Sequence, residues 1–226
     1  MTDHACVSVP RIGDPAPDFE AETTHGILRL EDFRGSWLVL FSHPADFTPV
    51  CASELVAFAG VRETLRSMHC ELLGLSVDSI FSHIAWVRSL REKFDVAIDF
   101  PLIADTTGEM ARRYGMTMPA ESPTEPARMV FVIDDRQIVR AFMAYPMTTG
   151  RNVAEIVRLV AALQATDAHG VATPAGWKPG DGVLAPPPRT QAMAEEQAQA
   201  AGPNCPPSRT ALPFSITAGA MAASAR

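Results

Sequence analysis

No two cysteines of this 226-residue chain are spaced as a C-x-x-C pair, and the chain has only four: Cys6, Cys51, Cys70 and Cys205. A C-x-x-C pair is typical of dithiol redox motifs and of zinc knuckles, so its absence argues against both. Four scattered cysteines also argue against the disulfide framework of a small secreted protein. Each cysteine therefore has to be judged by its own surroundings.

The chain also lacks a surplus of basic residues and any long apolar run. It has 19 Lys and Arg against 26 Asp and Glu, a net charge of −7 and a pI near 5.3. This balance argues against nucleic acid or an anionic membrane as an electrostatic partner, and no stretch is long enough to span a bilayer. The first residues, MTDHACVSVPRIGD, lack the basic segment and apolar core of a signal peptide. We expect a cytoplasmic protein without a nucleic-acid or membrane partner.

What the chain does have is an alternation of strand-like and helix-like patterns. WLVLFS (37–42) and ELLGLSV (71–77) are apolar runs typical of buried strands, and between them apolar residues recur every three or four positions. The other predicted elements are a helix over 83–94 with Val87, Leu90 and Phe94 on one side, a short strand over 100–105, a short helix over 107–115, a hairpin over 128–146 and a helix over 152–164. A βαβ half followed by a ββα half predicts an α/β protein of the thioredoxin-like fold with a mixed central sheet.

The composition changes at about residue 170. Nine of the 19 prolines follow this point, which is incompatible with a conventional packed domain. We expect an extended C-terminal arm with a short helix near 189–201 that lies on its own domain or on a partner subunit. The predicted organisation is a thioredoxin-like domain over 8–168 and an arm, or dimerisation extension, over 169–226.

The segment FSHPADFTPVCASEL (41–55) places a lone cysteine at the start of a predicted helix. A cysteine is a nucleophile only as thiolate, and a thiol with the ordinary pKa of about 8.5 is about 3% ionised at pH 7. Lowering such a pKa to about 6 takes about 3.4 kcal/mol, whereas a helix N-terminus supplies at most about 2 kcal/mol. A reactive Cys51 therefore needs a cation from elsewhere in the chain.

Two arginines are candidates for this cation. Arg128 precedes the apolar run MVFVID and so lies at the end of a strand, and Arg151 stands just before a predicted helix, where a positive charge opposes the helix dipole. Near the cysteine, Thr48 offers a hydroxyl that can donate to or accept from a small polar substrate, and Pro44 can wall a pocket without adding a donor. His43, directly before this loop, is either a pocket donor or a structural histidine.

Four segments then carry a family resemblance: HPADFTPVC (43–51), ARMVFVID (127–134), YPMTTGRNVAEIVRLVAALQ (145–164) and VATPAGWKPGD (171–181). The first resembles the loop that carries the reactive cysteine of peroxiredoxins, of the alkyl hydroperoxide reductase and thiol-specific antioxidant superfamily. The second resembles the strand with the active-site arginine, and the last two resemble downstream segments. The sequence of the first segment is most similar to that of the 1-Cys peroxiredoxin group. The resemblance covers about residues 10–190.

This resemblance implies a cofactor-free thiol peroxidase that reduces hydrogen peroxide and organic hydroperoxides. It implies that Cys51 attacks the peroxide and becomes a sulfenic acid, that Thr48 and Arg128 bind peroxide and thiolate, and that Pro44 shields the pocket. Arg151 and His43 match positions that line or buttress it. The implied partners are the peroxide, an external thiol reductant (a thioredoxin-like protein or a small thiol), and further copies of the chain in a homodimer or decamer.

Two features depart from the family pattern. A strict 1-Cys enzyme has no resolving cysteine, but this chain has Cys205 in its arm; the hypothesis is that Cys205 of a partner subunit resolves the sulfenic acid, and the alternative is an inert tail thiol. Mammalian members also carry a lipase-like serine working with a preceding histidine. Here Ser36 is present, but Glu31 and Asp32 occupy the region of that histidine, which argues against phospholipase activity.

Two other functions stay open. A Cys–His hydrolase with His43 as base is disfavoured because no orienting carboxylate is evident in the sequence and the eight-residue spacing is not that of a known triad. A holdase or scaffold built from rings of subunits is compatible with peroxidase activity.

Overall fold

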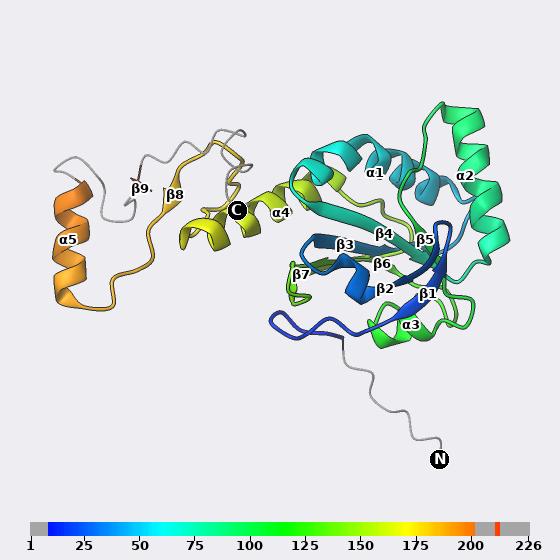
Figure 1. The fold of residues 1–226 in the computed structure, drawn as a ribbon, viewed down its shortest axis with the longest axis horizontal. Helices are drawn as coiled ribbons and strands as arrows, with labels where there is room; N and C mark the ends of the chain where they lie inside the picture. Colours follow the sequence, from blue (N-terminus) through cyan, green and yellow to red (C-terminus); the bar gives the residue numbers. More distant parts are fainter. Residues whose placement is uncertain (1–8, 202–210, 213–226) are drawn as a thin grey trace, which may run out of the picture. The chain divides into compact units, whose positions relative to one another are not determined.

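The computed structural model describes residues 9–201 and 211–212. The chain divides into two compact units at Val153, and each is described by itself. The first unit holds a seven-stranded sheet in the order β2-β1-β5-β4-β3-β6-β7 (Figure 1). Its strands are β1 (Glu20–Thr23), β2 (Gly26–Arg29), β3 (Trp37–Ser42), β4 (Cys70–Ser76), β5 (Leu102–Ala104), β6 (Arg128–Ile133) and β7 (Val139–Tyr145). Its helices are the 3-10 helix η1 (Leu30–Phe33), α1 (Pro49–Ser67), α2 (Ile80–Phe94) and α3 (Glu109–Arg113).

The centre of the sheet follows from the apolar runs of the sequence. Strand β3 is buried along its whole length and pairs in parallel with β4, which pairs in parallel with β5. On its other side β3 pairs antiparallel with β6, the first strand of the predicted hairpin with β7. This mixed sheet confirms the predicted α/β, thioredoxin-like fold.

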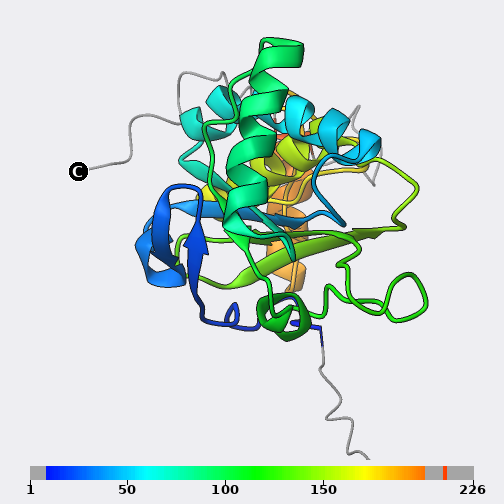
Figure 2. The ribbon, with the colours of Figure 1, turned by 90° about the vertical axis from the view of Figure 1, so that its right-hand side faces the viewer.

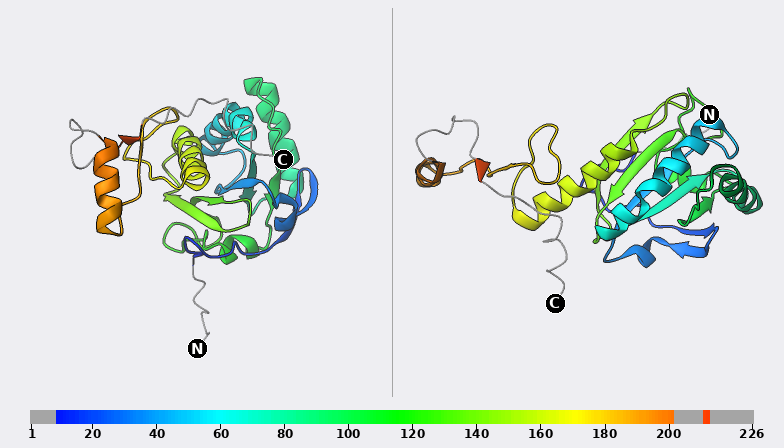
Figure 3. Two further views of the ribbon diagram at one scale, coloured as in Figure 1. Left: turned by 60° about the vertical axis from the view of Figure 1, so that its left-hand side comes forward. Right: turned by 90° about the horizontal axis from the view of Figure 1, so that it is seen from above.

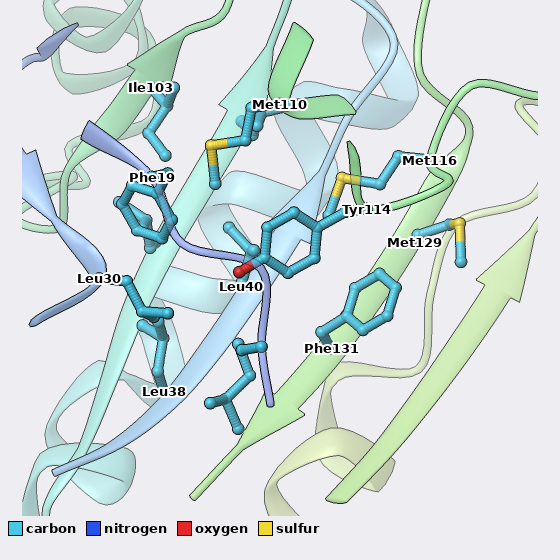
Figure 4. Packing of buried hydrophobic residues seen from close by; sticks show 14 of the residues in the cluster. Phe19, Leu30, Leu38, Leu40, Ile103, Met110, Tyr114, Met116, Met129 and Phe131 are labelled. Atoms are coloured by element: carbon cyan, nitrogen blue, oxygen red, sulfur yellow. The ribbon is translucent and has the colours of Figure 1, made fainter. Parts of the chain in front are cut away.

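Helices cover both faces of the sheet, with α1 and α2 on one side and α3 on the other (Figure 2). On the first side, Phe41 of β3 stacks on Phe58 of α1 with ring centroids 4.1 Å apart. On the second side, Tyr114 packs edge-on against Phe131 of β6 at 5.3 Å, and its hydroxyl donates to the carbonyl of Pro17 (Figure 4). Burial on both faces explains why the central strands are apolar without alternation.

The structure adds an edge hairpin that the sequence analysis did not predict. Strands β1 and β2 pair antiparallel beside β5, at the edge of the sheet opposite β7 (Figure 3). Both strands are only four residues long and largely exposed, which leaves little periodicity to detect. Their turn is held by the Thr23 hydroxyl, which donates to the carbonyl of Gly26, a glycine with a φ of 100°.

Helix α2 differs from its prediction in its start and in its buried face. It begins at Ile80, because the Ser79 hydroxyl accepts a hydrogen bond from the backbone N–H of Ser82 and caps the helix. The sequence analysis placed Val87, Leu90 and Phe94 on one side of this helix. The buried residues are His83, Trp86 and Leu90, so Leu90 is common to both sets, while Phe94 is 54% exposed.

The second unit contains α4 (Val153–His169), β8 (Val183–Leu184), α5 (Gln191–Ala201) and β9 (Ala211–Leu212), which pairs with β8. Trp177 is buried: its indole N–H donates to the carbonyl of Asp181, and its own carbonyl accepts from Arg158. The short helix expected near 189–201 is present as α5, while the division into 8–168 and 169–226 stays a prediction. Among the described helices, none is long and apolar enough to cross a membrane.

Candidate active site

Cys51 lies in the first turn of α1 and is completely buried. Pro49 opens the helix after Thr48, whose side chain makes no capping hydrogen bond. The N–H groups of the first helical turn have no partner within a helix, and here no Thr48 cap occupies them. Since Pro49 has no N–H, the donors that remain at this end are those of Val50 and Cys51. The thiol therefore lies where backbone donors and the helix dipole favour negative charge.

Arg128, the first residue of β6, supplies the cation that the sequence analysis required. Its Nη1 donates to Sγ of Cys51 at 3.3 Å, across 77 residues of sequence. The same nitrogen donates to Oε2 of Glu54 at 2.7 Å, and Nε donates to the carbonyl of Met147. These bonds hold the guanidinium at the sulfur in one orientation.

Glu54 joins the two predicted arginines, although the sequence analysis did not single it out. Its Oε2 accepts from Arg128 and from Nη2 of Arg151, both at 2.7 Å, and its Oε1 accepts from the backbone N–H and Nε of Arg151. The remaining nitrogen of Arg151 donates to the carbonyls of Ser42 and Met129. Arg151 thus buttresses Glu54 and Arg128 and makes no hydrogen bond to Cys51.

The charges of this buried group leave an excess positive charge beside the sulfur of Cys51. Two guanidinium groups and the Glu54 carboxylate sum to +1, and the side chains of all three are at most 3% exposed. A negative sulfur on Cys51 brings the sum to zero. An uncompensated buried charge is costly, and here the excess positive charge lies beside the sulfur.

The carboxylate of Glu54 is itself held ionised. Burial alone raises its pKa, but the hydrogen bonds and charge of Arg151, with the charge of Arg128, outweigh burial and hold the pKa of Glu54 below its ordinary value. A lowered pKa means that the ionised form stabilises the folded chain above about pH 4.3, the pKa of an unfolded glutamate. That stabilisation is lost as the pH falls through the lowered value.

Thr48 and Pro44 lie in the loop that leads into α1. The Thr48 hydroxyl donates to the carbonyl of Ala45 at 3.0 Å, so its proton is used and its lone pairs remain to accept. Pro44 is buried. Neither residue makes a hydrogen bond to Cys51 itself.

His43 lies in a separate buried cluster. Its Nε2 is 3.1 Å from Oδ1 of Asp46, its ring packs on Trp86, and no hydrogen bond joins it to Cys51 within the described ranges. Asp46 also contacts Nδ1 of His83. The carboxylate thought to be lacking near His43 is therefore present three residues later, where the sequence showed it only as one more residue of a polar loop.

The hydrogen bonds of this cluster set its charge. Burial lowers the pKa of His43 against the opposing effect of Asp46. Burial also acts to raise the pKa of Asp46, but the bonds to His43 and His83 prevail and hold it at about 2. Atoms of His43, Asp46 and His83 that could ligate a metal lie within 4.8 Å of one another. They are the only such group found in the described part of the chain.

The other cysteines differ from Cys51. Cys70 is buried at the start of β4, where burial, aided by the charge of Glu71, raises its pKa to about 12. This agrees with the structural role expected from the sequence. The candidate resolving residue Cys205, like Cys6, lies outside the described residues.

Comparisons with known proteins agree on one family. The model of the AhpC/TSA family matches residues 12–142, and that of the C-terminal domain of 1-Cys peroxiredoxin matches residues 162–200. A peroxiredoxin of Aquifex aeolicus is 53% identical over 204 residues, covering 85% of this chain and 92% of the relative. A peroxiredoxin of Methanosarcina mazei is 48% identical over 196 residues, covering 84% and 90%.

Solved structures of peroxiredoxins also match this chain. A cysteine-to-serine mutant of the Peroxiredoxin 6 of Arenicola marina matches with a TM-score of 0.76 and 36% identity, over 82% of this chain and 88% of that one. A yeast mitochondrial 1-Cys peroxiredoxin, studied for thiol resolution via glutathione/thioredoxin systems, matches with a TM-score of 0.75 and 40% identity, over 82% and 91%.

Proposed function

The chain belongs to the peroxiredoxin family, the thiol-dependent peroxidases of antioxidant defence, and on that premise we propose that Cys51 is its peroxidatic nucleophile, served by Arg128, Thr48 and Pro44. The observation that carries this assignment is the 3.3 Å hydrogen bond from Arg128 to Sγ of Cys51. Of the two cysteines described, Cys51 alone lies at a helix start with a guanidinium on its sulfur.

The proposed reaction is an in-line displacement. The thiolate of Cys51 attacks one peroxide oxygen, an S–O bond forms, and the O–O bond breaks. The products are a sulfenic acid on Cys51 and a hydroxide or alkoxide, which takes a proton to leave as water or alcohol. Negative charge moves from the sulfur to the departing oxygen. Arg128 and the N–H groups of the first turn of α1 are placed to stabilise that charge in a water-poor site.

The loop residues orient the peroxide. In the conformation described, the Thr48 hydroxyl has its proton on the carbonyl of Ala45, so it accepts a hydrogen bond from the O–H of the peroxide. Pro44 walls the pocket without a competing donor. Arg151 holds Glu54 and Arg128 in place, and His43 buttresses the loop from behind.

The product of the first half-reaction tests this assignment. Mixing the reduced chain with one equivalent of hydrogen peroxide should add one oxygen before the first time point of a rapid-quench experiment. Peptide mapping should place this oxygen on Cys51. Excess peroxide should add a second oxygen, as in a sulfinic acid. An oxygen found first on Cys6, Cys70 or Cys205 would contradict the proposal.

The second half of the cycle uses a thiol. We assign the reductant to the thioredoxin-like proteins or small thiols, because a similar yeast 1-Cys peroxiredoxin is described with glutathione/thioredoxin systems. We assign the working form to a homodimer or decamer in the cytoplasm, with no metal or organic cofactor in the reaction. Size-exclusion chromatography with light scattering measures the assembly.

Cys205 is proposed as the resolving cysteine on the sequence alone. After one equivalent of peroxide, a disulfide-linked dimer containing Cys51 and Cys205 is expected on non-reducing gels and in peptide maps. The dimer should be absent in Cys205→Ser. If wild-type chains stay monomeric on those gels while Cys51 is oxidised, Cys205 is an inert thiol and the cycle is of the 1-Cys type.

The hydrolase alternative finds less support in the geometry. His43 does have an orienting carboxylate in Asp46, but its Nε2 faces that carboxylate and its Nδ1 has no hydrogen-bond partner. No bond couples it to the thiol as a general base requires. Peroxide reduction is therefore the function that the site supports best, and a holdase role is compatible with it.

A further inference from the structure

The carboxylate of Asp46 connects the loop before Cys51 to helix α2. Its Oδ1 contacts Nε2 of His43 at 3.1 Å and Nδ1 of His83 at 3.0 Å. Its Oδ2 accepts from the Ser82 hydroxyl at 2.8 Å and contacts the same Nδ1 of His83 at 2.9 Å. His83 and Ser82 belong to the first turn of α2, so one side chain joins two separate elements.

The surroundings of Asp46 are built to hold it. Its side chain is 1% exposed, and its pKa of about 2 keeps it charged at neutral pH. The other ring nitrogen of His83 contacts the carbonyl of Ile103 in β5, which fixes the ring between a strand and the loop. The backbone N–H of Asp46 donates to Asp78, the residue that also accepts from the Ser76 hydroxyl of β4.

The loop needs such an anchor. Phe47, directly after Asp46, is a non-glycine residue with a φ of 58°, a conformation that its side chain disfavours. Thr48 and Pro49 follow at once and open α1, so the placement of Thr48 and Cys51 depends on this turn. A displacement of about 1 Å at a reacting group can cost about a hundredfold in rate.

We propose that Asp46, clamped by His83 and Ser82 of α2, is a positioning residue that holds the Thr48–Cys51 corner in its reactive, closed geometry. The clamp rests on the proposed role of Cys51, but it predicts a structural effect that can be measured without peroxide. In the closed geometry Cys51 is fully buried. Opening the loop therefore makes the thiol more accessible to an alkylating reagent while it disperses the groups that act on peroxide.

Trp86 provides a local reporter of this clamp. Its ring lies 5.3 Å from that of His43 and 6.2 Å from that of Phe47, and it is 2% exposed. Release of the loop exposes this indole and shifts its emission to longer wavelength. The signal of Trp86 is isolated by subtracting the spectrum of the Trp86→Phe chain, since the sequence has three tryptophans.

Asp46→Asn is the decisive variant. The substitution removes the negative charge and replaces one carboxylate oxygen by an N–H donor that faces His83. Part of the hydrogen bonding of the clamp is therefore lost. We expect the rate constant of Cys51 with hydrogen peroxide to fall by about tenfold or more. The alkylation rate of the same cysteine by iodoacetamide, followed on the peptide that carries it, should rise severalfold, with a red shift of Trp86. A simple loss of thiolate would lower both rates together.

Ser82→Ala is the milder variant, because it removes one hydroxyl and keeps the α2 backbone. We expect the rate of oxidation by peroxide to fall and the rate of alkylation to rise, each by about two- to threefold. Asp134→Asn is the matched control. Asp134 is also 1% exposed and accepts from Arg136, Ile138 and Arg140, but in the β6–β7 turn. It should lower the thermal midpoint and leave both rates and the Trp86 signal unchanged.

These outcomes separate the clamp from the proposed function. If peroxide does not oxidise Cys51 even in the wild type, the proposed function fails, whereas alkylation and Trp86 emission still test the clamp. Unchanged alkylation and emission in Asp46→Asn would overturn the clamp, as would a parallel fall of both rates. If Asp46→Asn does not fold, the same comparison is made with Ser82→Ala.

Discussion

Replacing Cys51 by serine is expected to reduce peroxide turnover to the uncatalysed background, a loss of at least about a thousandfold. A thiolate is the attacking group, and a serine hydroxyl stays protonated near neutral pH. The substitution exchanges one atom, so Arg128, Glu54 and the start of α1 keep their positions. Only the nucleophile is lost.

Peroxide consumption in the presence of excess dithiothreitol measures this effect. The matched control is Cys70→Ala, since Cys70 is equally buried and its pKa of about 12 keeps it a neutral thiol. The control should consume peroxide within about twofold of the wild-type rate, because Cys70 packs at the start of β4 and takes no part in the reaction. Appreciable turnover in Cys51→Ser would mean that another thiol carries the activity.

Replacing Arg128 by methionine is expected to slow the oxidation of Cys51 by about 10²- to 10³-fold, the usual effect of removing a donor that stabilises developing charge. The change removes the hydrogen bond to Sγ and one partner of Glu54. It also lowers the charge of the buried group from +1 to zero before Cys51 is counted. The excess positive charge beside the sulfur is then gone, so negative charge on the sulfur or on the departing oxygen loses its counter-charge.

Stopped-flow oxidation at several pH values separates the two contributions of Arg128. If the arginine favours the thiolate, the variant should recover part of its rate at alkaline pH; the part not recovered reports stabilisation of the leaving oxygen. Arg136→Met, which removes an arginine that is 73% exposed in the β6–β7 turn, is the control and should react at the wild-type rate. Wild-type kinetics in Arg128→Met would remove the arginine from the site.

Much of the fold was predictable because burial on both faces leaves a strong local signal. Strands β3, β4 and β6 each contain an unbroken run without polar side chains, LVLF, LLGL and MVFVI, and α1 shows the period of a helix with one buried face. The β1–β2 hairpin was missed because its strands are only four residues long and largely exposed. The full buried face of α2 was not identified because a histidine, His83, occupies a core position, where Asp46 and the carbonyl of Ile103 contact its two ring nitrogens.

The site, like the fold, has features that the sequence predicts and features that only the structure reveals. The sequence by itself determined that Cys51 lies at the start of a helix, that such a helix start is too weak to activate a thiol, and that a cation had to come from elsewhere. It also offered Arg128 and Arg151, each for its place at the end of an element. These conclusions depend on local order and on energies that do not require coordinates.

Only the tertiary structure decided what each charge faces. It placed Arg128 on the sulfur and Arg151 behind it, and it put Glu54 between them, one helical turn after Cys51. It likewise placed Asp46, which the sequence presents only as a polar loop residue, in a buried position where it contacts Ser82 and His83 of α2. Partners separated by 36 to 97 residues cannot be read from spacing. The reason is that a buried charge is stabilised by whatever the fold brings within about 3 Å, and local sequence does not determine that distance.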